Sequence, residues 1–323
     1  EKPKAFVFVD ACLEVMTGAM LPAGTNIVVP YEQVTIANHQ ATISAELKVD
    51  VMMNIHQKGS DVKQGSVILK RGTAILAPEI AALASVGKHA PLVFCAPKVA
   101  VISTGDELVE IDNAHPEDFQ IRKSNPYAIK AVIEAFGPFH VDLFHLNDQQ
   151  EAMMKEIQVI LSKYEMVLLS GGVSAGKFDF VPTVLRDLKV QEIFHKIKQR
   201  PGKPLWFGRG PEGQLVFGLP GNPISALFCC RRYVITALGW LISGGKFDGV
   251  FEGQRVRAES EYKAPKGVSF FRPCLIKKGM ANVYTTNGSG DLLSLCGSDG
   301  FIEFPPDREI KAGEEVLLFS WRV

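Results

Sequence analysis

Residues 166 to 179 read MVLLSGGVSAGKFD, an apolar strand-like run that passes directly into a glycine-rich loop. Strands without polar alternation are typical of parallel sheets that are covered by helices on both faces. Two similar transitions occur along the chain, in KVAVISTGDE at 98 to 107 and in VFGLPGNP at 216 to 223. We therefore expect the three segments to belong to one open α/β sheet.

Amphipathic segments alternate with these strands, which predicts βαβ units and a doubly wound parallel sheet over residues 97 to 243. Along this region we expect helices at 126 to 136, 148 to 164, 180 to 188 and 224 to 238, the second of them capped by Asp148, and a further strand at 139 to 143.

The flanking regions have a different pattern. Residues 1 to 56 predict a β-rich lobe of short strands at 6 to 9, 27 to 29, 33 to 36 and 42 to 47. Residues 57 to 96 predict a connecting α/β segment, with a strand-like run at 67 to 69 and a helix that has Pro78 in its first turn and Gly87 at its end. Residues 244 to 323 predict a small C-terminal β-barrel or sandwich, of which we choose the barrel. The fold class is therefore a multidomain α/β protein.

Composition excludes several classes of protein. Lysine plus arginine equals aspartate plus glutamate, at 35 each, so the excess of positive charge typical of nucleic-acid binding is absent. The six cysteines form no CxxC pair, and the histidines have no metal-ligand spacing near them. The apolar stretch at 233 to 242 is short and interrupted, and no secretory signal precedes Pro3. We expect a cytoplasmic protein that binds neither nucleic acid nor membrane.

Ligands of open α/β sheets bind beyond the carboxyl ends of the strands. After the first strand, Thr104 and Gly105 form a turn, and Asp106 and Glu107 place two carboxylates there. These acids also suit a helix cap. After the next quoted strand, Gly171 and Gly172 leave backbone amides free for an anion.

Ser174 adds a hydroxyl to the same loop, and Asp179 could bind a divalent cation, although it could also cap the following helix. In the third loop, Pro220 and Gly221 precede Asn222, which suits the N-cap of a helix whose amides favour negative charge. Ordinary capping would explain Asn222 equally well.

The segment KIKQRPGKP, at 196 to 204, surrounds a rigid Pro-Gly turn with positive charge, carried by Lys196, Lys198, Arg200 and Lys203. Such cations suit phosphate or another oxyanion, although a charged run is usually a solvated face. Together the loops predict a phosphate-bearing, nucleotide-like ligand and metal-assisted phosphoryl or nucleotidyl chemistry. No Ser-His-Asp order is present, and His195 is interpreted as a surface or core residue.

The sequence resembles the molybdopterin molybdenumtransferase family, the molybdenum insertases of molybdenum-cofactor biosynthesis, which includes the C-terminal E domain of gephyrin. Nine segments carry the resemblance in order: MTGAMLPAGTNIVV (16 to 29), NIHQKGSD (54 to 61), AALASVG (81 to 87), VISTGDEL (101 to 108), RKSNPYAIKAVIEAFG (122 to 137), LLSGGVSAGKFDF (168 to 180), KIKQRPGKPLWFG (196 to 208), VFGLPGNPISAL (216 to 227) and NGSGDLLSL (287 to 295).

The resemblance implies that adenylylated molybdopterin is cleaved in a Mg²⁺-dependent step, that molybdate is inserted at its dithiolene and that AMP is released. It implies catalytic roles for Glu107, Asp179 and Asp61, with Glu107 and Asp179 also as the Mg²⁺ ligands. The implied substrate-binding residues are Thr104, Gly105, Asp106, Ser124, Gly171, Gly172, Ser174, Lys198, Arg200, Lys203, Pro220, Gly221 and Asn222.

The resemblance also implies a homodimer in which Thr17, Gly18 and Asp61 of the partner's β-rich lobe complete the cleft. A molybdopterin adenylyltransferase is the implied functional partner. The chain departs from the family in three places: Arg200 replaces a lysine, Lys123 stands where an acidic or neutral residue is usual, and an N-terminal Asp-Gly-Tyr-type motif is missing before Glu1.

Two alternatives stay open. One is a relative with the same central domain that adenylylates molybdopterin or hydrolyses nucleotides, although such relatives lack the TGAMLPAG and GSGDLLSL segments. The other is a non-catalytic molybdopterin-binding scaffold.

Overall fold

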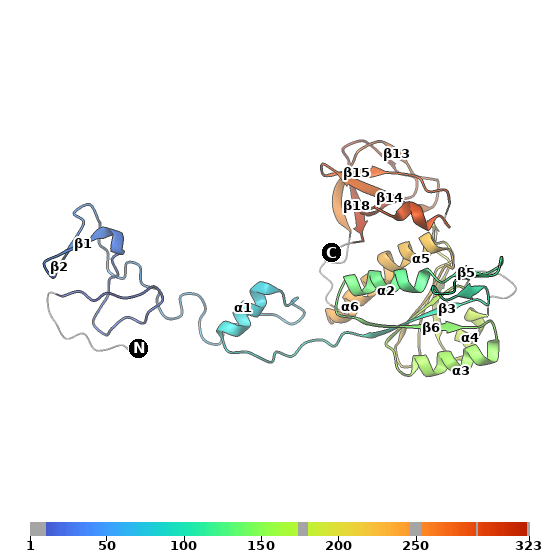
Figure 1. Cartoon of the computed structure of the whole chain (residues 1–323), viewed down its shortest axis with the longest axis horizontal. Helices are drawn as coiled ribbons and strands as arrows, with labels where there is room; N and C mark the ends of the chain where they lie inside the picture. The colour runs from blue at the N-terminus through green and yellow to red at the C-terminus, as the bar shows by residue number, and fades with distance from the viewer. Residues whose placement is uncertain (1–10, 174–179, 246–252, 289, 322–323) are drawn as a thin grey trace. The chain divides into compact units, whose positions relative to one another are not determined.

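The computed structural model describes residues 11–173, 180–245, 253–288 and 290–321 (Figure 1). The chain divides into two compact units, Glu1–Lys70 and Arg71–Val323, which are described in turn.

The described part of the N-terminal unit, residues 11–70, contains one hairpin, made of β1 (Val34–Ala37) and β2 (Gln40–Ile43) after the short helix η1 (Tyr31–Gln33). Asn38 and His39 between the strands both have positive φ, 51° and 61°, as a two-residue type I′ turn requires. The hairpin confirms two of the predicted strands with shifted ends, and the strand predicted at 6 to 9 lies outside the described residues.

Two other strand predictions before residue 71 are wrong. Residues 27–29 are irregular, although two backbone bonds link this segment to residues 52 and 53: the Val28 N–H to the Met53 carbonyl at 3.1 Å and the Met52 N–H to the Asn26 carbonyl at 2.7 Å. Residues 67–69 are irregular as well. Short apolar runs form strands only where a neighbouring strand supplies a continuous ladder of hydrogen bonds.

Helix α1 (Ala77–Ser85) opens the second unit and agrees with the sequence prediction. Pro78 lies in its first turn, where the missing N–H costs no hydrogen bond. The Glu79 carboxylate accepts the Leu76 N–H at 2.9 Å, and Gly87 follows the helix with a φ of 73°.

The central sheet has six strands in the order β6-β3-β7-β11-β10-β8. The bounds are β3 (Lys98–Thr104), β6 (His140–Leu146), β7 (Met166–Ser170), β8 (Gln191–His195), β10 (Trp206–Arg209) and β11 (Leu215–Leu219). Strands β6, β3, β7 and β11 are parallel, as predicted. Strand β10 is antiparallel to both of its neighbours, and the short link between β10 and β11 accounts for the pairing with β11.

Helices cover both faces of this sheet (Figure 1). They are α2 (Asn125–Ala135), α3 (Gln150–Leu161), α4 (Val181–Asp187), α5 (Pro223–Cys229) and α6 (Ile235–Ile242). Alternate residues of β3 point to opposite faces: Val99 and Val101 pack with α2 and α6, whereas Ala100 and Ile102 pack with α3 and α4. The central domain is therefore doubly wound.

Helices α5 and α6 are joined by the π-helical turn η2 (Cys230–Val234) into one helix of 20 residues, Pro223–Ile242. By length and composition alone this helix could cross a membrane. We did not expect this from the sequence, because only the shorter, interrupted apolar stretch at 233 to 242 was considered. However, 61% of its apolar window is buried inside the protein, where Val234 and Leu238 pack on the sheet. The apolar composition is therefore that of a core helix.

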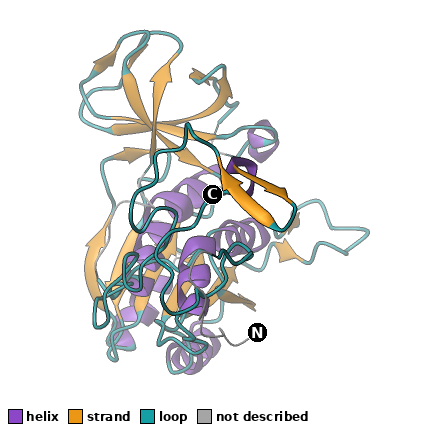
Figure 2. Cartoon of the chain, turned by 90° about the vertical axis from the view of Figure 1, so that its left-hand side faces the viewer, coloured by secondary structure: helices purple, strands orange, loops and turns teal. Residues whose placement is uncertain are grey.

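The C-terminal domain is a closed barrel of five strands, which confirms the prediction. The strands are β12 (Gln254–Ala258), β14 (Ser269–Lys277), β15 (Met280–Val283), β16 (Gly300–Phe304) and β18 (Glu315–Ser320). They follow the order β15-β12-β18-β16-β14, and β14 pairs back with β15. In Figure 2 this domain is the strand-rich part at the top.

Smaller elements connect the barrel to the central domain. Strand β9 (Gln199–Arg200) leaves the central domain and pairs in parallel with the barrel strand β14. Phe228 of α5 stacks on Phe301 of β16, with 4.3 Å between ring centroids. The remaining elements are β4 (Leu108–Val109), β5 (Ile121–Arg122), β13 (Tyr262–Lys263), β17 (Glu309–Ile310) and η3 (Leu292–Leu295).

Candidate functional site

The carboxyl ends of β3, β7 and β11 meet at one edge of the sheet. Ser170 pairs with Ser103 on one side and with Leu219 on the other, so the loops that follow the three strands begin side by side. They enclose a cavity of about 420 Å³, lined by Thr104, Gly105, Glu107, Asp148, Gly171, Gly172, Val173, Pro204, Pro220, Gly221 and Asn222. The structure therefore brings together the three loops that the sequence singled out.

The glycines after β7 are required by close packing against Thr104. Gly171 has a φ of 100°, and a Cβ atom there would lie 3.0 Å from both the carbonyl oxygen and Oγ1 of Thr104. Gly172 has a φ of 66°, and its Cβ would lie 2.9 Å from Val181 Cγ2. Any other residue would combine an unfavourable backbone conformation with a steric clash.

The acidic residues at this edge have separate roles. Glu107 lines the cavity, whereas Asp106 Oδ1 accepts the backbone N–H of Asp148 at 3.2 Å and braces the loop after β6. Asp148 does not cap the following helix as predicted, because α3 begins at Gln150 and Gln149 takes the N-cap position. Asp148 lines the cavity instead, and its position just after a parallel strand was the available signal.

A second cavity, of about 600 Å³, lies between the central domain and the barrel. Among the described residues, three cationic side chains line it: Arg200 and Lys203 from the Pro-Gly turn, and Arg272 from β14. It shares Pro204, Pro220 and Asn222 with the first cavity, so the two adjoin. Sequence reasoning missed Arg272 and Ser225, which lines the same cavity. Lys198 is exposed and does not line either cavity.

Asn125, at the start of α2, ties two of the loops together. Its side-chain amide donates to Ser170 Oγ and to the Gly221 carbonyl, both at 2.9 Å. The predicted residue Ser124 precedes this helix and makes no capping hydrogen bond. The sequence prediction chose Ser124, but its neighbour makes the bridging contacts.

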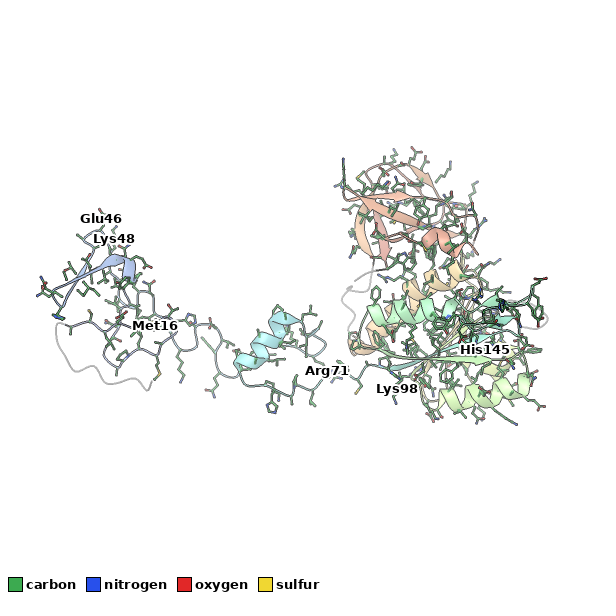
Figure 3. All side chains as sticks on the ribbon, viewed as in Figure 1. Met16, Glu46, Lys48, Arg71, Lys98 and His145 are labelled. Carbon is green, nitrogen blue, oxygen red and sulfur yellow. The ribbon has the colours of Figure 1, made fainter. Side chains whose placement is uncertain are left out.

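Lys123 occupies an environment separate from the cavities. Its buried ammonium lies 2.5 Å from Glu110 Oε1, and Tyr127 donates to Glu110 Oε2 at 3.1 Å. The Lys123 hydrogen bond is the main reason that the pKa of Glu110 is lowered. Burial, and secondly the charge of Lys123, lower the pKa of His145 at the end of β6 (Figure 3). The unusual lysine is thus neutralised by a local ion pair.

The remaining predicted residues lie elsewhere. Thr17, Gly18 and Asp61 belong to the N-terminal unit, where exposed Asp61 lies 2.9 Å from His56 Nε2. Ser174 and Asp179 lie outside the described residues. His195, half-buried, bonds through Nε2 to the Val173 carbonyl at 3.1 Å.

Among the described residues, no group of three or more histidine, cysteine or acidic side chains could hold a metal alone.

Family models match three successive parts of the chain. A probable molybdopterin binding domain matches residues 100–240, the MoeA N-terminal region (domain I and II) matches 2–87, and the MoeA C-terminal region (domain IV) matches 255–321. The first match contains the central sheet and the loops of the smaller cavity. Fold and site thus define a multidomain protein built on a molybdopterin-binding α/β domain.

Whole-chain relatives sharpen this class. A molybdopterin molybdenumtransferase of Synechocystis is 36% identical, over 96% of this chain and 77% of the relative. One from Staphylococcus epidermidis is 32% identical, over 95% and 73%. A crystal structure of a molybdopterin biosynthesis MoeA protein from Pyrococcus horikosii is 28% identical with a TM-score of 0.79, covering 100% of this chain and 79% of that one. The chain belongs to the MoeA family of molybdopterin molybdenumtransferases, enzymes of molybdenum-cofactor biosynthesis.

Proposed function

We propose that this chain inserts molybdate into adenylylated molybdopterin and releases AMP in a Mg²⁺-dependent reaction. The observation that carries the proposal is the pair of adjoining cavities. One has glycine turns and carboxylates and the other has three cationic residues, and they share Pro204, Pro220 and Asn222. This arrangement supports a nucleotide in the first cavity beside an oxyanion in the second.

The smaller cavity has the chemistry that a phosphate-bearing ligand needs. The turns at Gly171, Gly172 and Gly221 expose backbone, and the long helix beginning at Pro223 directs its N-terminus to the same edge. Amides and the positive end of a helix dipole stabilise phosphate charge. We propose that Thr104, Gly105, Gly171, Gly172 and Asn222 hold the pterin nucleotide. The family resemblance adds Ser124 and Ser174.

The acidic side of this cavity fits Mg²⁺. Magnesium is commonly held by only one or two carboxylates together with substrate phosphate oxygens. Glu107 and Asp148 supply two such groups, and the family resemblance adds Asp179. When bound, the ion would neutralise phosphate charge as AMP leaves. Glu107 would position the ion, while the glycine amides orient the phosphates.

The larger cavity fits the tetrahedral dianion molybdate. Arg200, Lys203 and Arg272 supply positive charge, and Ser225 adds a hydroxyl donor. Arginine in place of the usual lysine at 200 keeps the charge and offers a planar pair of donors that suits two oxyanion oxygens. Molybdate held here would lie next to the pterin end of a nucleotide in the smaller cavity.

We also propose that the protein works in the cytoplasm as a homodimer. The partner's N-terminal unit would contribute Thr17, Gly18 and Asp61 to the cleft, and a molybdopterin adenylyltransferase would supply the adenylylated substrate. Asp61 is 81% exposed in its side chain, as expected of a residue that acts on a neighbouring chain.

The test measures AMP release from adenylylated molybdopterin by the full chain, with and without molybdate and Mg²⁺. We expect release that depends on Mg²⁺ and that falls by about 10²-fold or more in Glu107→Gln, the scale of losing an electrostatic group in the transition state. The matched control is Glu117→Gln, an exposed carboxylate outside both cavities.

Binding of adenylylated molybdopterin without AMP release would refute the insertase and favour the scaffold alternative. Formation of adenylylated molybdopterin from nucleoside triphosphate would favour the adenylyltransferase alternative instead. Equal activity of Glu107→Gln and the control would show that Glu107 has no catalytic role.

A further inference from the structure

The turn that carries Arg200 and Lys203 is fixed on two sides by backbone contacts. At its base, the Ile197 N–H donates to the Lys203 carbonyl and the Lys196 N–H to the Leu205 carbonyl, both at 2.9 Å. On its outer side, β9 pairs with β14, so that Arg200 lies opposite Phe270 of the barrel. The cationic turn is therefore an edge strand of the barrel as well as part of the central domain.

Gln199 lies inside this turn and is 3% exposed. Both the nitrogen and the oxygen of its side-chain amide have partners. Its Nε2 donates to the Pro201 carbonyl at 2.8 Å and contacts Cys229 Sγ at 3.7 Å, while its Oε1 accepts the Tyr233 hydroxyl. Burial raises the pKa of Tyr233, so its hydroxyl stays protonated and able to donate. The Gln199 amide thus fills the turn, and Cys229 and Tyr233 of the long helix hold it in place.

The π-helical turn η2 is the part of the helix that supplies these contacts. Its signature is the Ile235 N–H bond to the Cys230 carbonyl, five residues back. Three consecutive side chains here reach three different partners: Arg231 Nε donates to the Ser320 carbonyl at 2.6 Å, Arg232 pairs with Glu303 at 3.0 Å, and Tyr233 bonds to Gln199. Single π-turns of this kind occur frequently at functional sites.

The contacts of η2 therefore join the barrel to the cationic turn. Arg231 and Arg232 bind barrel residues of β18 and β16, and Tyr233 binds the amide that fills the turn. Tyr233 is not among the residues that line the two cavities, whereas Gln199 lines the larger one, so Tyr233 reaches a ligand there through Gln199.

We infer that Tyr233 and Gln199 are positioning residues that fix Arg200 and Lys203 for the oxyanion in the larger cavity. The inference rests on the proposed function, because molybdate is the oxyanion concerned. The turn carries Arg200 and Lys203, and Arg272 of β14 lines the same cavity. Without the Tyr233 hydroxyl, the Gln199 amide loses one of its anchors and the turn becomes less ordered.

The experiment compares Tyr233→Phe with the wild-type full chain in calorimetric titrations with sodium molybdate and in molybdate-dependent AMP release. We expect the molybdate Kd and KM to rise by about fivefold to tenfold, the scale of one hydrogen bond, with kcat at saturating molybdate unchanged. Gln199→Met, which keeps the side-chain length but removes its donors and acceptor, should have the same effect or a larger one.

Tyr164→Phe is the matched control. Its hydroxyl also donates to a side chain, Asp142 Oδ2, at 2.7 Å, but on the opposite face of the sheet. We expect an unchanged molybdate KM in this variant, with a comparable loss in Tm. A purely structural role for Tyr233 would lower Tm in both variants and leave molybdate affinity alone, which would overturn the inference.

If the proposed function itself is wrong, the same measurements give a different result. Wild-type protein would then show neither molybdate binding nor molybdate-dependent AMP release, and the inference would fall with it. Wild-type binding that is matched by Tyr233→Phe and Gln199→Met would overturn the positioning role alone.

Discussion

At Gly171, two loops of the site pack closely against each other. Its backbone has a φ of 100°, and its missing side chain leaves room for the Thr104 carbonyl and hydroxyl. A neighbouring loop can therefore lie directly against the end of β3. The shape of the smaller cavity depends on this contact, because Thr104 and Gly171 both line it.

We predict that Gly171→Ala lowers the free energy of unfolding by about 2 to 3 kcal/mol, from backbone strain and a clash of its Cβ with Thr104. The matched control is Gly213→Ala in the β10–β11 turn, where φ is 94°. A Cβ added at this position would lie 3.4 Å from its nearest neighbour, an atom at the end of a flexible arginine side chain. This control should lose only about 1 kcal/mol. Denaturant unfolding of both variants measures the difference, and equal losses would contradict the packing argument.

Individual site residues were predictable where the local sequence fixes their place. Gly171, Glu107 and Asn222 follow apolar strands, and parallel strands put such loops at one edge. Arg272 was not predictable, because it reaches its cavity only through the docking of the barrel. Asp148 looked like a helix cap, since a carboxylate before an amphipathic run suits that role equally well.

The strands and helices of the central domain followed from hydrophobic periodicity. Runs such as β3 and β7 are apolar throughout because both of their faces are covered. The orientation of β10 was not predicted, since an apolar run has the same composition in either direction. The orientation follows from the chain connection, because the short link between β10 and β11 permits only an antiparallel pair.

The π-turn η2 illustrates a limit of periodicity. Apolar spacing predicted a helix at 224 to 238, and the observed helix continues to Ile242. Inserting one residue into a turn changes which side chains point to the barrel, but it leaves the overall apolar pattern helical. The contacts of Arg231, Arg232 and Tyr233 therefore emerge only from the structure.

The whole molecule joins a molybdopterin-binding domain, a barrel and an N-terminal unit. The barrel and helix α5 of the central domain share the apolar cluster around Phe228 and Phe301, and the larger cavity is lined from both domains. The N-terminal unit carries Asp61, which the proposed dimer would use on the opposite chain. This proposal can be tested without knowledge of the dimer geometry.

We predict that Asp61→Asn and Glu107→Gln chains, each inactive alone, complement one another in heterodimers. If Asp61 acts on the partner chain, one of the two sites in each heterodimer has both carboxylates, which gives about half of wild-type activity. Heterodimers purified through two different affinity tags and assayed for AMP release provide the measurement. No recovery in verified heterodimers would mean that Asp61 acts within its own chain.

The most direct measurement of the proposed site is anomalous X-ray scattering at the molybdenum edge from crystals of the full chain grown with molybdate. We predict one strong peak in the larger cavity, placed so that the molybdate oxygens can accept hydrogen bonds from Arg200, Lys203 and Arg272, next to the shared residues Pro220 and Asn222. A cavity without molybdenum, with peaks only elsewhere on the protein, would contradict the assignment of the two adjoining cavities to nucleotide and oxyanion.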